Sequence, residues 1–493
     1  MIDNENAGLI QDGLLRASIS LPDKIAISID HSELSYRDLV SHSKVISHEF
    51  MVLESERIFL CMPNGLSLVK CFFGALFAGK SVGLLDPSWP SALMRESVQE
   101  HFNCIFVGTE EWVSLFREIA KPDRVFSEGD LMVQNNIPND FTLNNIQVSE
   151  NSPFLTVFTS GSEGVPKSFE RTHKSWVSSF NNSELEFRSN QNAIMVVPGP
   201  LSHGVSLFGL LSGLYFGRTV AIQTNFDAHK ILNICVSSRS VELVLVPSMV
   251  DLLVEAASDI TYSSVDKIIS GGAKLLEAGR RRAQYTFPNA EMIEYYGASE
   301  LSFVTVSKEA EGCPVESVGR VFYGAELDIR DTDSNSLGVG CVGEIWVKSD
   351  MLCVAAMSTN LSAKLLMENG WATVRDLGFI DKDGFLFLQG RVGSTINTGG
   401  YTVHPFSVEK LLLKHPAVFD VKVFGFQDNK WGELVCAAIV LTEGTEATTD
   451  QLYDYCLQEL EPYSCPRRWV FLDSIDKLSN GKVNIFALRK YID

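Results

Sequence analysis

The sequence predicts an α/β protein with a large N-terminal domain of layered α/β subdomains plus a small β-barrel, followed by a small α+β C-terminal domain. The chain has 493 residues, of which 45% are apolar, and this is enough to fill more than one core. Apolar, strand-like runs alternate with helix-like segments between about residues 30 and 330. The pattern then shifts to short strands with many turns, and it changes again after Gly390–Gly393.

Four apolar runs illustrate the strands that we expect in the N-terminal domain: Phe154–Phe158, Ala193–Val197, Val241–Val246 and Val265–Ile269. The last two are separated by a segment of helical spacing, so they indicate mostly parallel sheets. From about residue 319 to 387 the strands shorten and turn residues become frequent, as in DTDSNSLGVG and DKDG. We therefore expect the small β-barrel, or a meander, in that region.

The C-terminal domain is predicted to begin after residue 390, which gives domains of residues 1–390 and 391–493. Helical spacing runs over Phe406–Leu413, and Val418–Phe424 and Cys436–Leu441 have the pattern of strands.

One glycine pattern resembles a dinucleotide-binding motif but does not have its context. Gly338, Gly340 and Gly343 spell GxGxxG, but they precede a strand-like run instead of following one, so a turn is expected there and not a dinucleotide site.

The charge balance excludes two classes of partner. The chain carries 41 basic and 61 acidic residues, a formal charge of −20, which argues against nonspecific binding of nucleic acid or anionic lipid. The N-terminus lacks a signal-peptide layout, and the apolar run after Asn64 is interrupted by Lys70 and Lys80. Ten cysteines form no CxxC pair and nine histidines show no zinc-ligand spacing. We expect a cytoplasmic protein with reduced thiols and no membrane span.

The segment Thr159–Lys167, TSGSEGVPK, is the strongest local signal of function. Glycines allow a backbone to approach an anion, hydroxyl and amide groups donate hydrogen bonds to it, and the lysine adds charge. The loop suits the phosphates of a nucleotide, although Pro166 excludes the common ATPase phosphate loop. Taken alone, such a stretch is more often an ordinary turn.

Further motifs follow in a fixed order. They are LSYRDL at Leu34–Leu39, the run Asn64–Pro87, EYYGASE at Glu294–Glu300, WATVRDLG at Trp371–Gly378, GRVGSTINTGGYTVHP at Gly390–Pro405, and LSNGK ending at Lys482. With Thr159–Lys167, this set resembles the acyl-adenylating enzymes: acyl- and aryl-CoA synthetases, peptide-synthetase adenylation domains and firefly luciferase. The resemblance covers most of the chain.

The resemblance implies ATP and Mg²⁺ as cofactors and assigns residues to them. The expected phosphate contacts are Thr159, Ser160, Gly161, Ser162, Gly164 and Lys167. The expected adenine slot is formed by Tyr295, Tyr296 and Gly297 on one wall and by Gly271, Gly272 and Ala273 on another. Asp376, joined by Arg391, is expected at the ribose hydroxyls, because a carboxylate can accept two hydrogen bonds from a cis-diol.

Three residues are expected to act on the reacting groups. Glu300 is the expected Mg²⁺ ligand, since magnesium takes one or two carboxylates together with phosphate oxygens and water. Ser299 is expected to touch the α-phosphate or the substrate carboxylate. Lys482 is expected to arrive with a mobile C-terminal domain and to neutralise both reactants as they meet.

A second half-reaction needs a thiol, from CoA or from the phosphopantetheine arm of a separate acyl or peptidyl carrier protein. Gly399, Gly400 and Tyr401 match the loop that lines the pantetheine tunnel in the family, and Gly393 stands at the hinge. The chain departs from the family pattern at several positions, namely Glu163, Ser168, Gly393 and Asn397.

The acid pocket is expected along Val197–Leu214, with His203, Gly204, Gly271 and Phe303 as substrate residues. No carboxylate occurs from residue 197 to 215, and this favours an acid without an α-amine. His203 could equally be a partly buried histidine with a satisfied hydrogen bond. Apolar residues at helical spacing here, Leu207, Phe208 and Leu211, could line a tunnel or belong to the core.

The sequence thus predicts an ATP-dependent ligase that joins a small-molecule carboxylic acid to a thiol through an acyl adenylate. A free-standing amino-acid adenylating enzyme and a non-catalytic nucleotide- or acyl-binding homologue stay open as alternatives. The identity of the acid, the choice between CoA and a carrier protein, and the oligomeric state are not predicted.

Overall fold

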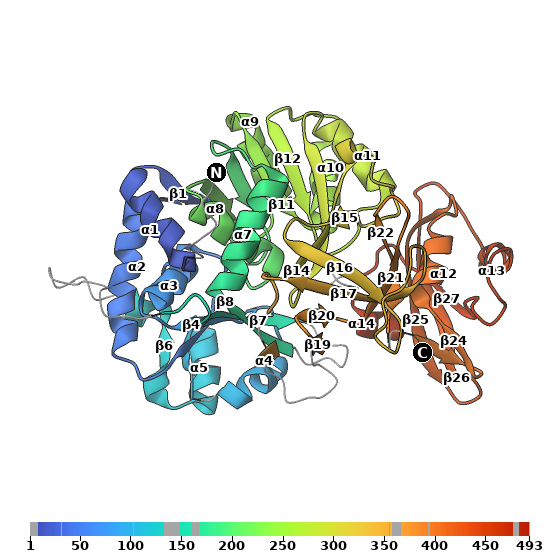
Figure 1. Ribbon diagram of the computed structural model, residues 1–493, viewed down its shortest axis with the longest axis horizontal. Helices are drawn as coiled ribbons and strands as arrows, with labels where there is room; N and C mark the ends of the chain where they lie inside the picture. Colours follow the sequence, from blue (N-terminus) through green and yellow to red (C-terminus); the bar gives the residue numbers. More distant parts are fainter. Residues whose placement is uncertain are drawn as a thin grey trace. The chain divides into compact units, whose positions relative to one another are not determined.

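A computed structural model describes residues 8–30, 32–101, 103–132, 148–159, 167–353, 355–356, 366–392, 395–476 and 483–492. The chain divides into two compact units. The first contains residues 1–315, 319–326 and 347–372, and the second contains residues 316–318, 327–346 and 373–493. The α/β fold class predicted from the sequence is confirmed (Figure 1). The predicted boundary after residue 390 stays a prediction.

The largest sheet of the described chain has nine strands in the order β15-β14-β13-β12-β11-β9-β10-β1-β2. Its strands are β1 (Ile25–Ile29), β2 (Ser32–Ser35), β9 (Ile194–Val197), β10 (Thr219–Ile222), β11 (Val241–Leu245), β12 (Val265–Ser270), β13 (Glu291–Ala298), β14 (Ser302–Lys308) and β15 (Arg320–Val321). Within the sheet, the six neighbouring strands β13, β12, β11, β9, β10 and β1 are parallel. Strand β2 at one edge, and β14 and β15 at the other, are antiparallel to their neighbours. The strands predicted at residues 193–197, 241–246 and 265–269 are confirmed as β9, β11 and β12.

A second sheet of the first unit has seven described strands in the order β18-β8-β7-β4-β3-β5-β6. These are β3 (Arg57–Cys61), β4 (Ser81–Leu84), β5 (Ile105–Gly108), β6 (Val125–Ser127), β7 (Pro153–Thr159), β8 (Lys167–Thr172) and β18 (Ala355–Ala356). The apolar run before the Ser/Gly-rich segment is β7, as expected. Strands β7 and β8 pair in antiparallel fashion on either side of that segment.

Helices cover these sheets, and side-chain caps start several of them (Figure 1). Ser35, Thr172 and Asp227 each accept a hydrogen bond from the backbone three residues on. The helices of the first unit are α1 (Ile10–Ser20), α2 (Tyr36–Met51), α3 (Leu66–Phe77), α4 (Ser91–Val98), α5 (Glu110–Ile119), α6 (Glu128–Met132), α7 (His173–Phe187), α8 (Gly204–Tyr215), α9 (Ala228–Ser237), α10 (Pro247–Ala257) and α11 (Glu277–Thr286).

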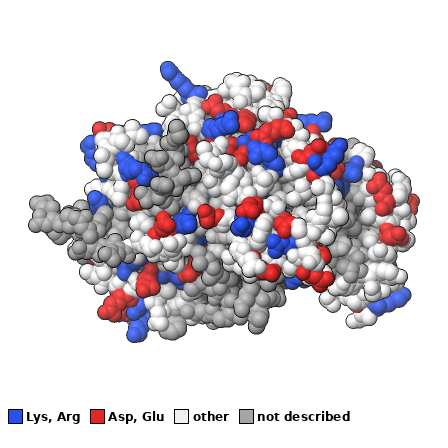
Figure 2. All heavy atoms as spheres, viewed as in Figure 1, with Lys and Arg blue, Asp and Glu red and all other residues white. Residues whose placement is uncertain are grey.

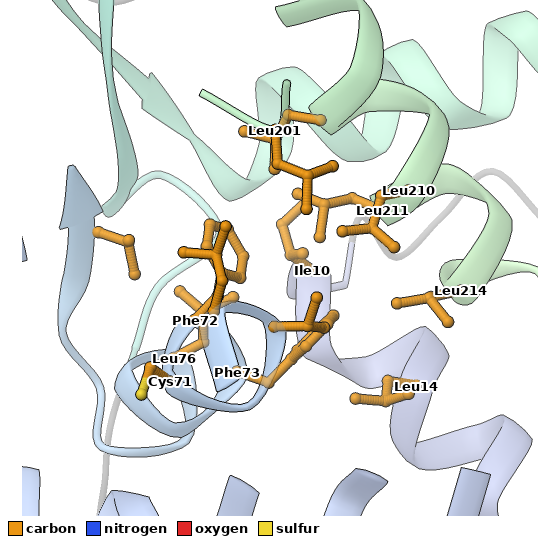
Figure 3. Close-up of a cluster of buried hydrophobic side chains, with 14 of the residues drawn as sticks. Ile10, Leu14, Cys71, Phe72, Phe73, Leu76, Leu201, Leu210, Leu211 and Leu214 are labelled. Atoms are coloured by element: carbon orange, nitrogen blue, oxygen red, sulfur yellow. The ribbon is translucent and has the colours of Figure 1, made fainter. Parts of the chain in front are cut away.

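The main core of the first unit lies where α8 packs against α1 and α3 (Figure 3). Leu210, Leu211 and Leu214 of α8 are almost fully buried there. They meet Ile10 and Phe73 from the N-terminal helices. Leucine and phenylalanine surfaces removed from water in this way contribute most of the stability that holds α8 in place.

The second unit contains the predicted C-terminal α+β structure. Its five-stranded sheet has the order β24-β23-β26-β25, with β27 beside β26. The strands are β23 (Ile396–Thr398), β24 (Tyr401–Val403), β25 (Val418–Asp428), β26 (Gly432–Leu441) and β27 (Arg468–Phe471), with helices α12 (Pro405–Leu412), α13 (Thr449–Leu457) and α14 (Ile485–Arg489). The helix and two strands predicted between residues 406 and 441 are confirmed.

The β-rich region between these parts forms a six-stranded sheet in the described chain, in the order β19-β20-β17-β21-β22 with β16 beside β17. Its strands are β16 (Ala325–Arg330), β17 (Gly343–Ser349), β19 (Leu366–Glu368), β20 (Trp371–Thr373), β21 (Asp376–Ile380) and β22 (Leu386–Arg391). Gly338 and Gly340 lie in the turn that precedes β17 and Gly343 begins that strand, so the glycines do not open a helix, as expected.

The surface view shows acidic and basic residues interspersed (Figure 2). No helix in the described residues combines the length and apolar character needed to cross a bilayer.

Candidate active site

The predicted nucleotide and acid residues of the first unit meet at one edge of the nine-stranded sheet. Strands β9, β11, β12 and β13 are parallel, so their carboxyl ends share an edge. His203 and Gly204 follow β9, and Gly271 to Ala273 follow β12 directly. Tyr295 to Gly297 form the end of β13, just before Ser299 and Glu300. In open α/β sheets, ligands bind in the crevice outside such strand ends.

The turn that carries Ser299 and Glu300 joins β13 to β14. Ala298 pairs with Ser302, so the turn is short, and the amide of Leu301 donates to the carbonyl of Ala298 at 3.1 Å. A Cβ on Gly297 would lie 2.0 Å from the carbonyl oxygen of Ser302, so this position requires glycine. The Ser302 hydroxyl is 2.9 Å from that of Ser179 on α7. The hairpin end is thereby fixed to a neighbouring helix.

Arg171 of β8 holds the same turn from the other sheet. Its guanidinium donates to the carbonyl oxygens of Ser299 at 2.8 Å and Met351 at 2.6 Å. The side chain is fully buried, and burial lowers the pKa of Arg171 to about 10, while Cys353 and Glu300 act to raise it. The amide of Cys353 donates to the carbonyl of Glu300 at 2.9 Å. The backbone under both predicted reacting residues is therefore fixed.

Sequence reasoning missed Arg171. The signal that could have found it is a charged residue in a strand whose neighbours Phe169 and Thr172 are buried, because a buried arginine needs designated acceptors. Among the described residues, the hydrogen bonds of Arg171 go to the backbone carbonyls of Ser299 and Met351, so we assign Arg171 a role in positioning Ser299 and Glu300.

The structure describes only the ends of the predicted phosphate loop. Thr159 ends β7, Lys167 begins β8, and the two residues are Cα partners. The two residues that flank the loop are therefore neighbours in the sheet, and Lys167 begins the strand that carries Arg171. Ser160, Gly161, Ser162, Glu163 and Gly164 lie outside the described residues.

The two walls of the predicted adenine slot differ in exposure. Gly272 and Ala273 are exposed, and Gly272 has φ +90°, a conformation that favours glycine. Tyr296 is partly buried and pairs with Thr305 of β14. The side chain of Tyr295 lies against Gly271, where a Cβ would be 2.2 Å from the ring. Strand alternation thus sends Tyr295 and Tyr296 to opposite faces of the sheet.

His203 is held by a buried carboxylate. Its Nε2 lies 3.2 Å from Oδ2 of Asp86, which is 3% exposed. Oδ1 of Asp86 accepts from the amide of Ser88 at 2.9 Å and from its hydroxyl at 2.6 Å. Burial alone would raise the pKa of Asp86, but the hydrogen bonds from His203 and Ser88 outweigh it and hold that pKa below its usual range.

The contact between His203 and Asp86 could not be seen in the sequence. No carboxylate occurs in the segment around His203, yet Asp86 supplies one in space from the end of β4. Both of its oxygens accept hydrogen bonds from protein groups. Asn64 fixes the adjoining loop by donating to Gly199 at 2.9 Å and accepting from the amide of Leu201 at 2.9 Å.

The apolar side chains of α8 divide between core and site. Leu207 and Leu211 are buried in the main core, so the core interpretation holds for them. Phe208 faces the other way and contacts Phe303 of β14, with ring centroids 4.9 Å apart. Phe303 is 3% exposed and also contacts Tyr295, at 4.7 Å.

The predicted ribose pair lies in the second unit. Asp376 and Arg391 are partners on β21 and β22, and the Arg391 Nε donates to Asp376 Oδ1 at 2.5 Å. Asp376 belongs to a strand and not to the plain turn that an Asp-Leu-Gly sequence usually marks. The predicted ribose role needs a carboxylate that can accept hydrogen bonds from a diol, and the position of Asp376 on a paired strand fixes its backbone.

The predicted thiol-acceptor loop is a tight hairpin turn between β23 and β24. Gly399 has φ +58° and Gly400 φ +86°, values that a two-residue type I′ turn requires. A Cβ on Gly399 would lie 2.8 Å from the Trp431 ring, and the Gly399 amide donates to the Trp431 carbonyl at 2.8 Å. The amide of Asn397 donates to Glu433 at 2.8 Å.

Beside this turn the second unit has an open aromatic groove of about 720 Å³. Tyr401 and Tyr463 stack at 4.3 Å with their planes 11° apart. The Arg467 guanidinium lies 3.7 Å over the Trp431 ring. We call this the aromatic groove; its other lining residues are Thr449, Asp450, Tyr453, Pro462, Pro466 and Trp469.

Two predicted residues of the second unit, Lys482 and the hinge residue Gly393, lie outside the described residues. A magnesium site fits the donors that are described. No group of three His, Cys, Asp or Glu side chains in the described residues could hold a metal without other ligands. One carboxylate, that of Glu300, together with phosphate oxygens and water makes a usual magnesium environment.

The fold is that of an α/β protein with a large parallel sheet in the first unit and a smaller α+β sheet in the second. The family model named AMP-binding enzyme matches residues 16–356, and the model named AMP-binding enzyme C-terminal domain matches residues 407–482. The chain therefore belongs to the AMP-binding enzyme family, and the predicted resemblance is confirmed.

Relatives with similar lengths extend the comparison. The chain is 30% identical over 485 residues to YhfT of Bacillus subtilis (strain 168), an uncharacterized acyl–CoA ligase, covering 96% of each chain. It is 26% identical over 468 residues to VraA of Staphylococcus aureus (strain MRSA252), provisionally named a long chain fatty acid–CoA ligase, covering 94% of each. Among solved structures, o-succinylbenzoate CoA synthetase (MenE) from Bacillus subtilis, in complex with its acyl-adenylate intermediate, shares the fold. Its TM-score is 0.83 at 22% identity, over 98% of this chain and 97% of that chain.

Proposed function

We propose that this chain is an ATP-dependent acid–CoA ligase, which activates a carboxylic acid as an acyl adenylate, releases pyrophosphate and transfers the acyl group to CoA. The observation that carries the proposal is the meeting of His203–Gly204, Gly271–Ala273 and Tyr295–Glu300 at one sheet edge, in a chain of the AMP-binding enzyme family. The names of YhfT and VraA, which are both acyl–CoA ligases, support it.

The first half-reaction needs alignment and charge neutralisation more than a protein nucleophile. A carboxylate oxygen of the acid attacks the α-phosphorus of ATP, and the bond to pyrophosphate breaks. Ser299 and Glu300 stand on a turn that Arg171 holds, so they can meet the reacting groups without reorganising the backbone. Lys482 would neutralise the acid and the α-phosphate, and Thr159–Lys167 would hold the β- and γ-phosphates.

Glu300 would hold the magnesium ion, which offsets the charge of the triphosphate when bound. The MenE fold relative has also been solved in complex with ATP and a magnesium ion. Asp376 would accept from the ribose hydroxyls, with Arg391 fixing its orientation through the 2.5 Å hydrogen bond.

We infer a carboxylic acid without an α-amine as the substrate class. An ammonium group needs an uncommitted carboxylate beside it, and Asp86, the carboxylate beside His203, already accepts from His203 and Ser88. A hydroxamate assay across amino acids tests the alternative of an amino-acid adenylating enzyme.

We infer CoA, in preference to the arm of a carrier protein, as the acceptor. The aromatic groove lies next to the Gly399–Gly400 turn in the same unit, and it offers stacking faces with Arg467 among them. A nucleobase gains about 1–3 kcal/mol from stacking on an aromatic side chain, and a carrier protein presents no base. A cytoplasmic location, where thiols stay reduced, fits this acceptor.

Replacement of Tyr463 tests the acceptor. Tyr463→Ala removes one face of the stack and is expected to raise the KM for CoA about tenfold, while acid-dependent pyrophosphate release keeps its wild-type rate. Tyr491→Ala, at an exposed tyrosine near the C-terminus, serves as the matched control. An unchanged KM for CoA, or equal use of phosphopantetheinylated carrier protein by both proteins, would count against CoA.

The proposed function is tested by incubating the full chain with Mg²⁺-ATP and pools of fatty, aryl and amino acids. Acid-dependent release of pyrophosphate, and a CoA thioester when CoA is added, are expected. Detectable ATP binding with no release from any pool would instead support the non-catalytic homologue.

A further inference from the structure

Tyr295 fills the space beside Gly271, which is a residue of the acid site if the proposed function holds. Gly271 directly follows β12 and Tyr295 lies on β13, and the two are neighbours because Ser270 of β12 pairs with Glu294 of β13. The ring of Tyr295 lies so near Gly271 that a Cβ there would be 2.2 Å from Cζ and 2.6 Å from the hydroxyl oxygen. The glycine thus makes room for the tyrosine, which occupies the space beside it.

Tyr295 belongs to a continuous aromatic wall made of Tyr295, Phe303, Phe208 and Phe187. Phe303 is central: its ring centroid is 4.7 Å from that of Tyr295, 4.9 Å from Phe208 and 5.7 Å from Phe187. All three contacts are edge-on, with interplanar angles of 72° to 84°. Edge-to-face packing of this kind is favourable and fixes the rings, so the wall does not yield readily to a ligand.

Little space lies behind the aromatic wall. The cavity bounded by Tyr295, Phe208 and Phe187 has a volume of about 20 Å³. This is room for about one water molecule and not for a chain of methylenes. Arg218 also lines this cavity; its guanidinium donates to Glu184 at 2.6 Å, and its side chain is 1% exposed. A buried ion pair is a poor surface for the end of an alkyl chain.

We propose that Tyr295 sets the depth of the acid pocket and that the substrate is a compact acid, with a short chain or a single ring, and not a long-chain fatty acid. Tyr295 is thereby a specificity-determining residue. A compact acid differs from the long-chain fatty acid that the name of VraA implies. The acid in the name of MenE is also compact, but the similarity to MenE shows a shared fold and not a shared substrate.

The test compares acids of increasing length on the full chain. Acid-dependent pyrophosphate release is measured with butanoate, benzoate, octanoate, dodecanoate and hexadecanoate, for the wild type and for Tyr295→Ala. The wild type is expected to favour butanoate or benzoate over hexadecanoate by at least about tenfold in kcat/KM. Tyr295→Ala joins the small cavity to the pocket and is expected to raise kcat/KM for octanoate about tenfold relative to butanoate.

Phe322→Leu is the matched control, because Phe322 stacks on Phe303 at 4.5 Å but does not line the cavity. It is expected to keep the wild-type preference for length. Tyr295→Leu provides a second variant if the alanine protein does not fold, with a smaller shift in the same direction. A wild type that uses hexadecanoate as well as short acids would overturn the proposal. An unshifted preference in a folded Tyr295 variant, or an equal shift in Phe322→Leu, would overturn it too. No release from any acid by any of these proteins would instead count against the proposed ligase.

Discussion

The proposed magnesium ligand, Glu300, stands on a backbone that the protein itself holds in place. The carbonyl of Ser299 accepts from Arg171, and the carbonyl of Glu300 accepts from the amide of Cys353. The backbone on both sides of the Glu300 side chain is therefore held before any ligand binds. A ligand positioned in this way loses little conformational entropy on binding.

We predict that Glu300→Gln lowers acid-dependent pyrophosphate release by about 100-fold, because the amide keeps the shape but loses the charge that a magnesium ion requires. The rate is measured over a series of Mg²⁺ concentrations. Glu309→Gln, at an exposed glutamate following β14, is the control and should retain the wild-type rate. Wild-type activity of Glu300→Gln at every Mg²⁺ concentration would contradict the assignment.

The role of Lys482 is predicted from its motif, LSNGK, alone. We predict that Lys482→Ala lowers adenylate formation by about 100-fold or more, since it removes the charge that meets both reactants. Transfer of a preformed acyl adenylate to CoA should be nearly unaffected. The two half-reactions are assayed separately, with Lys490→Ala as the control lysine. Equal loss in both half-reactions would show that Lys482 has a different role.

At the scale of elements, the hairpin of β13 and β14 is the part of the site most dependent on its backbone. The register shifts between Tyr296 and Gly297, so the carbonyl of Ser302 comes to lie over the Gly297 Cα. Ser302 itself has φ +61° and is held through its hydroxyl by Ser179. The irregular register lies directly before the turn that carries Ser299 and Glu300.

We predict that Gly297→Ala lowers the free energy of unfolding by about 1–3 kcal/mol, because its Cβ would overlap the Ser302 carbonyl. Pyrophosphate release should fall as well, since relieving the overlap moves the Ser299–Glu300 turn. Denaturant unfolding and the activity assay measure the two effects. Gly129→Ala, in the exposed part of α6, should be neutral or slightly stabilising. An alanine at 297 that costs no more than one at 129 would refute the overlap.

At the scale of the whole molecule, the sequence predicted what local pattern determines. The strands β11 and β12 follow from their apolar runs, and the Gly399–Gly400 turn follows from the glycine pair. Motif order then supplied the family, which the family models confirm. The pairing of Asp376 with Arg391 came from the same resemblance, and the antiparallel register of β21 and β22 accounts for it.

Contacts between distant parts of the chain could not be predicted in this way. Asp86 reaches His203, and Arg171 reaches Ser299, only because two separate sheets lie together in the first unit. A single sequence shows neither the relative position of those sheets nor the partner of each buried charge. The face to which Tyr295 points depends on strand register, since a shift of one residue exchanges the two faces. The proposed size of the acid pocket depends on the face to which Tyr295 points, so it could be inferred only from the structure.

Buried His173 makes the stability of the whole molecule depend on pH. It is 2% exposed, and its Nδ1 accepts from the amide of Ile10 at 3.1 Å, which links the start of α1 to α7. Burial lowers the pKa of His173 to about 4 from its ordinary value of 6.5. Between these two values the unfolded chain binds a proton that the folded chain does not bind. The free energy of unfolding must therefore fall as the pH decreases from about 6.5 to about 4.

We predict that this loss reaches about 3 kcal/mol and that His173→Gln, whose amide oxygen can still accept from Ile10, removes most of it. The free energy of unfolding is measured by denaturant titration across that pH range. His229→Gln, at an exposed histidine of α9, should keep the wild-type slope. The lowered pKa of Asp86 makes its own contribution at more acid pH, since that stability is present above about pH 4 and disappears below it. The two groups therefore act in separate pH ranges, and an unchanged slope in His173→Gln above pH 4 would exclude His173 as the cause.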